Sequence, residues 1–195
     1  MTVRSVTGVW VGRVVGAATL AAVTIHSEHP FADPEDERDP ARRLRGRVGG
    51  TVALLTSGPA DDRAGLTVSS LMVGHGDPAH VLALVDPDSD LAAVLARSER
   101  GVVQLLSWEH RDLADAFAGV APAPGGVFRL GAWEQTPWGP LLAGVSAWAG
   151  FAVESTREVG WSLLVDGVLD EIHLGEPGEP LLHRRGRYVR PAGAS

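Results

Sequence analysis

The sequence predicts a mainly β protein, a β-barrel with a few helices and antiparallel strand pairing. From residue 51 onward, short apolar runs alternate with Gly, Pro and Asp, and the runs have the lengths of strands. Hairpin-like loops join several of these runs, which favours antiparallel neighbours. Only two segments in this region show the apolar spacing of a helix. A closed or half-open barrel therefore fits better than a parallel α/β sheet.

The first 25 residues form an apolar but interrupted segment. Arg13 and several glycines divide it, so it lacks the run of about 18 apolar residues that a membrane-spanning helix needs. Three interpretations remain open: a signal peptide, an arm of the mature protein, or an extension upstream of a native start near Val23. We expect a cytoplasmic protein.

Residues 26–50 are dense in charge and proline, as is typical of a loop or arm. A short helix is predicted over 40–47, with Asp39 as its N-cap. His26 and His29 have no carboxylate-rich partner set near them in the sequence, so we expect no metal site there. The expected organisation is an N-terminal arm or misannotated extension over 1–42, one barrel domain over 43–190, and a tail over 191–195.

The barrel elements follow in chain order. Four apolar runs are expected as strands in the first half of the barrel: 51–57, 66–74, 80–86 and 101–107. Two helices are expected, one over 89–99 with Ser89 as its cap and one over 109–119 that ends at Gly119. After a Pro/Gly-rich loop, three or more strands are expected within 140–175, and a last one within 180–190.

The composition excludes several classes of function. The 195-residue chain has a net charge of −7, which argues against a general nucleic-acid binder. It has no cysteine, so disulfides, zinc–thiolate sites, iron–sulfur clusters and thiol nucleophiles are excluded. The carboxylates show no spacing that would identify a glycosidase or a metal site, and no Ser–His–Asp arrangement is discernible. We expect neither a membrane nor a nucleic acid as partner.

The stretch AGLTVSSLMVGHGDPAHVLALVDPDSD (64–90) places hydroxyl residues at the ends of apolar runs. One interpretation is turn chemistry and helix capping alone. The other is an anion site, in which the hydroxyls and nearby backbone N–H groups hold a cofactor phosphate. The spacing matches neither a P-loop nor a dinucleotide fingerprint. The residues by themselves leave both interpretations open.

Four segments together point to a known family. They are TVALLTSGPADDRAGLTVSSLMVGHGDPAHVLALVDPDSD, VVQLLSWEHRDLADAFAG, TPWGPLLAGVSAWAGFAV and PLLHRRGRY. In order and spacing this set resembles the flavin reductase-like, FMN-binding split-barrel family, over about residues 43 to 190. The resemblance implies an antiparallel barrel of the Greek-key type that binds FMN, with FAD as a possible alternative. It also implies a homodimer whose flavin sites lie near the dimer interface.

The resemblance further implies an oxidoreductase that moves hydride or electrons through a bound flavin, with a nicotinamide dinucleotide or a partner oxygenase as possible partners. It assigns no catalytic residue. The implied flavin contacts are Thr67, Ser69 and Ser70 on a strand, Val73, Gly74 and His75 along the ring, Ser89 at the phosphate, and Trp161 as a stacking side chain.

The chain departs from the family pattern at four places, one of which is His75 in place of a small hydroxyl residue. In VGWSLLVDGV, Trp161 and Ser162 stand where members that use NAD(P)H carry the Asp and His of a G-D-H triplet. We therefore expect weak direct oxidation of NAD(P)H. Gln104 stands where the family usually has Asn, and His110 where it has Gln. Two other functions stay open: a non-catalytic flavin-binding protein for storage or sensing, and a split barrel that binds a deazaflavin or haem.

Overall fold

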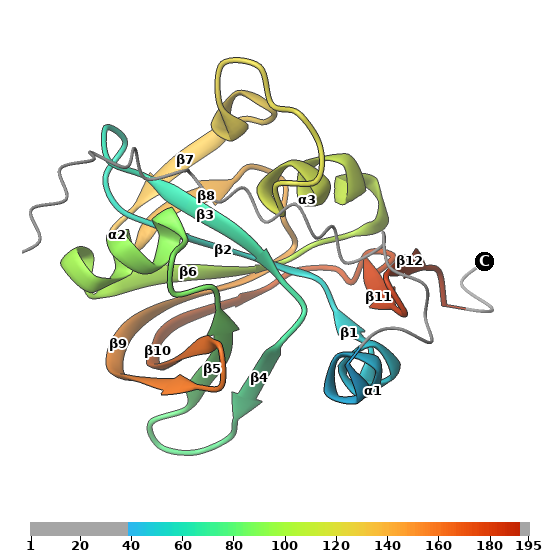
Figure 1. Cartoon of the computed structure of the whole chain (residues 1–195). Coiled ribbons are helices and arrows are strands. Elements are labelled where there is room, and N and C mark those ends of the chain that lie inside the picture. The colour runs from blue at the N-terminus through green and yellow to red at the C-terminus, as the bar shows by residue number, and fades with distance from the viewer. Residues whose placement is uncertain (1–38, 192–195) are drawn as a thin grey trace, which may run out of the picture.

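The computed structural model describes residues 39–191. The predictions for the N-terminal arm, for a signal peptide or later start, and for His26 and His29 fall outside the described residues. The described part is mainly β, and its largest sheet is antiparallel and curled into a half-barrel (Figure 1). This confirms the predicted fold class. Within residues 39–191 no helix is long and apolar enough to cross a membrane.

The seven strands of this sheet have the spatial order β3-β2-β6-β9-β10-β5-β4. Their bounds are β2 Ala53–Ser57, β3 Ala64–Val68, β4 Leu71–Gly74, β5 His80–Val85, β6 Arg100–Leu105, β9 Ala147–Val159 and β10 Ser162–Leu174. Two small sheets flank it. One consists of β1 Gly50–Thr51, β11 Leu182–Arg184 and β12 Arg187–Val189. The other consists of β7 Trp133–Thr136 and β8 Gly139–Leu142.

The prediction of one strand over 66–74 is wrong. The chain forms two strands there, β3 and β4, which lie at opposite edges of the curled sheet and are joined by Ser69 and Ser70. β3 pairs with β2, whereas β4 pairs with β5. One continuous strand could not follow both neighbours, so the chain breaks between the two edges. The predicted strands 51–57, 80–86 and 101–107 are confirmed, the first with an interruption at Val52.

The helices begin at the predicted caps. Asp39 accepts a hydrogen bond from the backbone of Ala41 at the start of α1 (Pro40–Val48), and Ser89 does the same for Ala92 at the start of α2 (Asp90–Ser98). The third helix starts with a 3₁₀ turn (Trp108–His110) and continues as α3 (Arg111–Phe117). A 3₁₀ turn over Val127–Arg129 precedes β7.

The core has two parts. Inside the curl, α2 places Leu91 and Leu95 against a group of buried strand residues that includes Phe151. The ring of Phe151 lies so close to Gly101 and Gly167 that a Cβ on either would come within 2.5 Å of it. A second cluster packs α3 against the outer strands and the C-terminal segment, with Val52, Leu54, Leu106, Phe117 and Leu181 buried. Leu55 belongs to the first cluster and Leu54 to the second, so both faces of β2 are buried.

Candidate flavin site

The link between β3 and β4 lies at the end of the sheet where several predicted site residues meet. Ser70 donates its hydroxyl to the carbonyl of Leu84 (2.7 Å), and the Leu84 N–H donates to the carbonyl of Ser70 (3.4 Å). In the neighbouring strand pair, which β5 forms with β10, Leu163 lies opposite Val85. Continuing that register by one residue sets Ser162 opposite Asp86. The structure thus brings Ser69–Ser70, the turn that carries Ser89, and Trp161–Ser162 to one end of the sheet.

Val73, Gly74 and His75 lie at the opposite end of β4. Gly74 pairs with His80, the first residue of β5, whereas Val85 is the last. Five residue steps of a strand separate those two ends by about 17 Å. A ligand that contacts both groups of predicted residues must therefore extend along β4 and β5.

Three of the four predicted hydroxyls have structural partners. Thr67 Oγ1 donates to the carbonyl of Ala114 in α3 (2.8 Å), and Ser70 is bonded to β5. Ser89 Oγ donates to the Asp86 carbonyl (2.6 Å) and accepts from the Ala92 N–H (3.2 Å). Within residues 39–191 the Ser69 hydroxyl has no hydrogen-bond partner, and its side chain is half-buried. Ser69 is therefore the predicted hydroxyl that remains available to a ligand.

The charges around Ser89 are mostly negative. Asp86, Asp88 and Asp90 flank it, although the N-terminus of α2 itself favours an anion. A hollow of about 450 Å³ borders Asp90, and Arg63 and Arg129 line it. The Arg63 guanidinium lies 4.4 Å from the ring centroid of Phe128. A phosphate bound at Ser89 would need such cationic side chains, because three carboxylates stand close to it.

Gly74 leaves open space along β4. A Cβ built at this position would meet no atom closer than 3.8 Å, and its φ does not lie in the left-handed region. The fold therefore does not require glycine there. Close approach of a flat ring to the backbone would require it.

Trp161 lies outside the core, in the turn between β9 and β10. Gly160, at the first central position, has φ +59°, which is the arrangement of a two-residue hairpin loop with glycine first. The Trp161 side chain is 95% exposed. Other apolar side chains exposed on the same sheet include Met72 and Val73, each 64% exposed, and Leu84.

Two further departures from the family pattern, Gln104 and His110, have structural explanations. Gln104 is fully buried; its Oε1 accepts from the Leu142 N–H (2.7 Å), and its Nε2 donates to Thr56 Oγ1 (2.9 Å). His110 closes a capping box, because its Nδ1 accepts from the Ser107 N–H (3.2 Å). Burial lowers the pKa of His110 against the opposing effect of Glu109. The imidazole is thus kept neutral, as an accepting Nδ1 requires.

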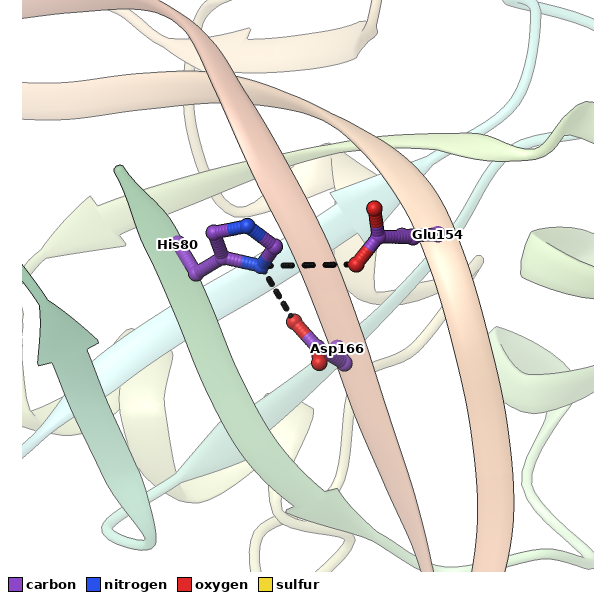
Figure 2. Close-up of side chains that lie close together, drawn as sticks. All are labelled: His80, Glu154 and Asp166. Carbon is purple, nitrogen blue, oxygen red and sulfur yellow. Dashed lines mark hydrogen bonds and ion pairs between the residues drawn. The ribbon is translucent and has the colours of Figure 1, made fainter. Parts of the chain in front are cut away.

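One cluster of titratable side chains was not foreseen from the sequence. His80, Glu154 and Asp166 come from three neighbouring strands and point toward one another (Figure 2). His80 and Asp166 are 86 positions apart in the chain. No spacing rule could have joined them.

The curled antiparallel sheet, with its hydroxyl link between the two edges, defines a split-barrel protein. The sequence matches the flavin reductase like domain over residues 45–192. It is 30% identical over 158 residues to an NADH-dependent FMN reductase of Streptomyces nodosus subsp. asukaensis, which covers 80% of this chain and 85% of that protein. The chain belongs to the flavin reductase-like domain family, as the sequence predicted.

Two further proteins are similar to this chain. One is the 4-hydroxyphenylacetate 3-monooxygenase reductase component of Pseudomonas aeruginosa, which is 24% identical over 151 residues, covering 76% of this chain and 89% of that protein. The other is the structure of the NADH:FAD oxidoreductase of Streptomyces globisporus C-1027, which superposes with a TM-score of 0.73 at 24% identity. It covers 84% of this chain and 98% of that one, and it supports the fold. The family match and the Streptomyces nodosus relative confirm the predicted class of function, an oxidoreductase of the flavin reductase type.

Proposed function

We propose that this protein is an FMN reductase that takes hydride from NADH and releases reduced flavin to an acceptor. The observation that carries the proposal is the family match, which spans the whole described barrel. In the net reaction NADH and one proton reduce FMN, and NAD⁺ leaves. The flavin ring supplies the electron chemistry, and the protein supplies binding, orientation and the local field.

The flavin is proposed to lie along β4, with the ring over the open backbone at Gly74. The Ser69 hydroxyl is offered to the ligand, since it has no partner within the described chain. Thr67, Ser70 and Ser89 shape the site indirectly, because their hydroxyls hold α3, β5 and α2 in place. Val73 and His75 flank Gly74. Trp161 lies at the opposite end of the sheet, so it would stack on a ring held at Gly74 of a second copy.

The proposed weak point is the binding of the nicotinamide. Trp161 and Ser162 offer neither the carboxylate nor the imidazole that relatives with a G-D-H triplet have at this turn. Loss of one hydrogen bond to a charged group costs about 1.5–3 kcal/mol. We therefore expect NADH to be oxidised more slowly than in a relative with the triplet.

The proposal includes a two-fold homodimer. Met72 and Leu84 expose apolar surface on one face of the sheet, and a second copy would cover it. A second copy could also bring an arginine to the carboxylates around Ser89. Such an interface should bury more than about 1,000 Å² in total. Light scattering at micromolar protein concentration, with FMN bound, tests this; a monomer would contradict it.

The proposed physiological partner is an oxygenase that consumes reduced flavin. The Pseudomonas aeruginosa relative carries a name that describes it as the reductase component of a monooxygenase. A cytoplasmic location is part of the proposal, and it is supported by Arg13 and the glycines that interrupt the N-terminal apolar segment.

Two measurements test the proposal together. The visible absorption spectrum of the purified protein, with unbound FMN removed, should be that of a flavin, and NADH should be consumed in an FMN-dependent way. Flavin binding without NADH consumption would favour a storage or sensing protein. The spectrum of a bound deazaflavin or haem would overturn the choice of FMN.

A matched pair of variants locates the site. Ser69→Ala should weaken FMN binding and leave the free energy of unfolding unchanged within about 0.5 kcal/mol, because the hydroxyl has no partner in the fold. Ser89→Ala should lower stability by about 1 kcal/mol, since it removes a helix cap. Unchanged FMN affinity in Ser69→Ala would show that the flavin lies elsewhere.

A further inference from the structure

His80, Glu154 and Asp166 converge on one point of the sheet formed by β5, β9 and β10 (Figure 2). His80 Nδ1 lies 2.8 Å from Asp166 Oδ1 and 3.8 Å from Glu154 Oε2. The three ligand atoms all lie within 4.8 Å of one another. The cluster thus joins one imidazole and two carboxylates from three strands.

A β-bulge lies at the cluster. Asp166 pairs with Ser155, but the next residue, Gly167, pairs with Val153, so Glu154 is the extra residue of β9. Glu154 therefore lies between the partners of Asp166 and Gly167, next to Asp166 on the neighbouring strand. Bulges are over-represented next to functional sites.

The charge of the cluster is not balanced by arginine. Within residues 39–191, Glu154 and Asp166 each form an ion pair with His80 and with no arginine. The side chains of His80 and Asp166 are each 27% exposed and that of Glu154 is 57% exposed, so an ion from solvent can reach them. Two carboxylates held this close attract a cation.

We propose that His80, Glu154 and Asp166 form a binding site for a divalent transition-metal ion of the zinc type. Zinc binds imidazole nitrogen and carboxylate oxygen at about 2.0–2.2 Å, which sets neighbouring ligand atoms of a tetrahedral site about 3.4 Å apart. The observed separations of 2.8 and 3.8 Å bracket this value. Three protein ligands leave the fourth position to water.

The imidazole decides which ions fit. Mg²⁺ and Ca²⁺ prefer oxygen ligands alone, whereas zinc and related ions accept nitrogen together with oxygen. A bound ion would take the place of the proton that His80 and Asp166 share. It would also tie β5, β9 and β10 together across the bulge. The site does not depend on a bound flavin.

The test is titration of the full-length, tag-free protein with Zn²⁺ by calorimetry, together with the visible spectrum of bound Co²⁺. We expect one ion per chain, without displacement by a large excess of Mg²⁺. Glu154→Gln and Asp166→Asn should each weaken Zn²⁺ binding by more than about tenfold, since even partners outside the ligand set change metal affinity by about 10- to 100-fold. Circular dichroism checks that both variants are folded.

Two control variants make the outcome specific. Glu158→Gln changes an exposed carboxylate on the same strand and should leave Zn²⁺ affinity unchanged. The double variant His26→Ala, His29→Ala removes imidazoles outside the described chain and should also bind Zn²⁺ normally. The proposal is overturned if the unmodified protein binds no Zn²⁺ at millimolar concentration. It is equally overturned if the cluster variants bind as well as the unmodified chain, or if binding is lost with His26 and His29.

Discussion

Replacing Trp161 by Asp and Ser162 by His should speed the reduction of FMN by NADH. The change restores an acidic and an imidazole side chain at the turn between β9 and β10. The fold should tolerate it, because the Trp161 side chain is 95% exposed and Ser162 is only half-buried. We expect the free energy of unfolding to change by no more than about 0.5 kcal/mol, as for other surface substitutions.

The size of the gain follows from one restored charged hydrogen bond. Such a bond contributes about 1.5–3 kcal/mol, and about 1.4 kcal/mol corresponds to a factor of ten. The kcat/KM for NADH should therefore rise by about ten- to a hundredfold. If the Trp161 ring stacks on the flavin, its loss should weaken flavin binding by about 0.5–1.5 kcal/mol.

The assay is steady-state oxidation of NADH at saturating FMN, with the Kd of FMN measured separately by fluorescence quenching. The two single variants show which residue carries the gain. Leu174→Asp, an exposed apolar residue at the far end of β10, controls for adding a carboxylate to the surface. The reasoning fails if kcat/KM of the double variant stays within twofold of the unmodified protein at equal FMN occupancy. It fails as well if the unmodified protein already has a micromolar KM for NADH and an ordinary kcat.

Three further outcomes are expected. Gly74→Ala should weaken FMN binding without lowering the melting temperature, because a Cβ there has ordinary contacts in the fold; unchanged affinity would place the ring elsewhere. Gln104→Leu should lower the free energy of unfolding by about 1–3 kcal/mol, since the buried Leu142 N–H loses its acceptor; thermal unfolding measures this, and an unchanged midpoint would contradict it. His110→Gln keeps an acceptor for the Ser107 N–H and removes a titrating group. Burial lowers the pKa of His110 below 6.5, so its contribution to stability is present above pH 6.5 and is lost as the pH falls toward the folded pKa. Urea unfolding on both sides of pH 6.5 should show a smaller pH dependence in the variant, and an equal dependence would refute the assignment.

The sequence predicted those parts of the fold that depend on local signals. Asp39 and Ser89 mark the starts of α1 and α2 because a cap acts on the backbone two or three residues away. The break between β3 and β4 escaped prediction because it depends on which strands pair. Both pieces are apolar, and nothing within 66–74 shows that they lie at opposite edges of the sheet.

The candidate site was likewise predicted only in part. The resemblance placed Ser69, Ser89 and Trp161 in one site, and the structure sets their segments at the same end of the sheet. It could not reveal that Ser69 lacks a partner within residues 39–191, since that depends on contacts made by other strands. The cluster around His80 could not be predicted from the sequence at all. Its three residues come from separate strands, and only the pairing of β5, β9 and β10 brings them together.

The departures from the family pattern at Gln104, His110 and Trp161 are therefore of two kinds. Gln104 and His110 have complete hydrogen-bonding roles within the fold, so their presence needs no functional explanation. Trp161 has no such role, because its side chain is almost entirely exposed at the tip of a hairpin. A large aromatic residue in that position leaves apolar surface in water and adds nothing to the core. That surface is stabilised only when a bound ring or a second copy covers it. The turn with Trp161 is thus the place where the chemistry of this chain should differ from that of relatives with the G-D-H triplet.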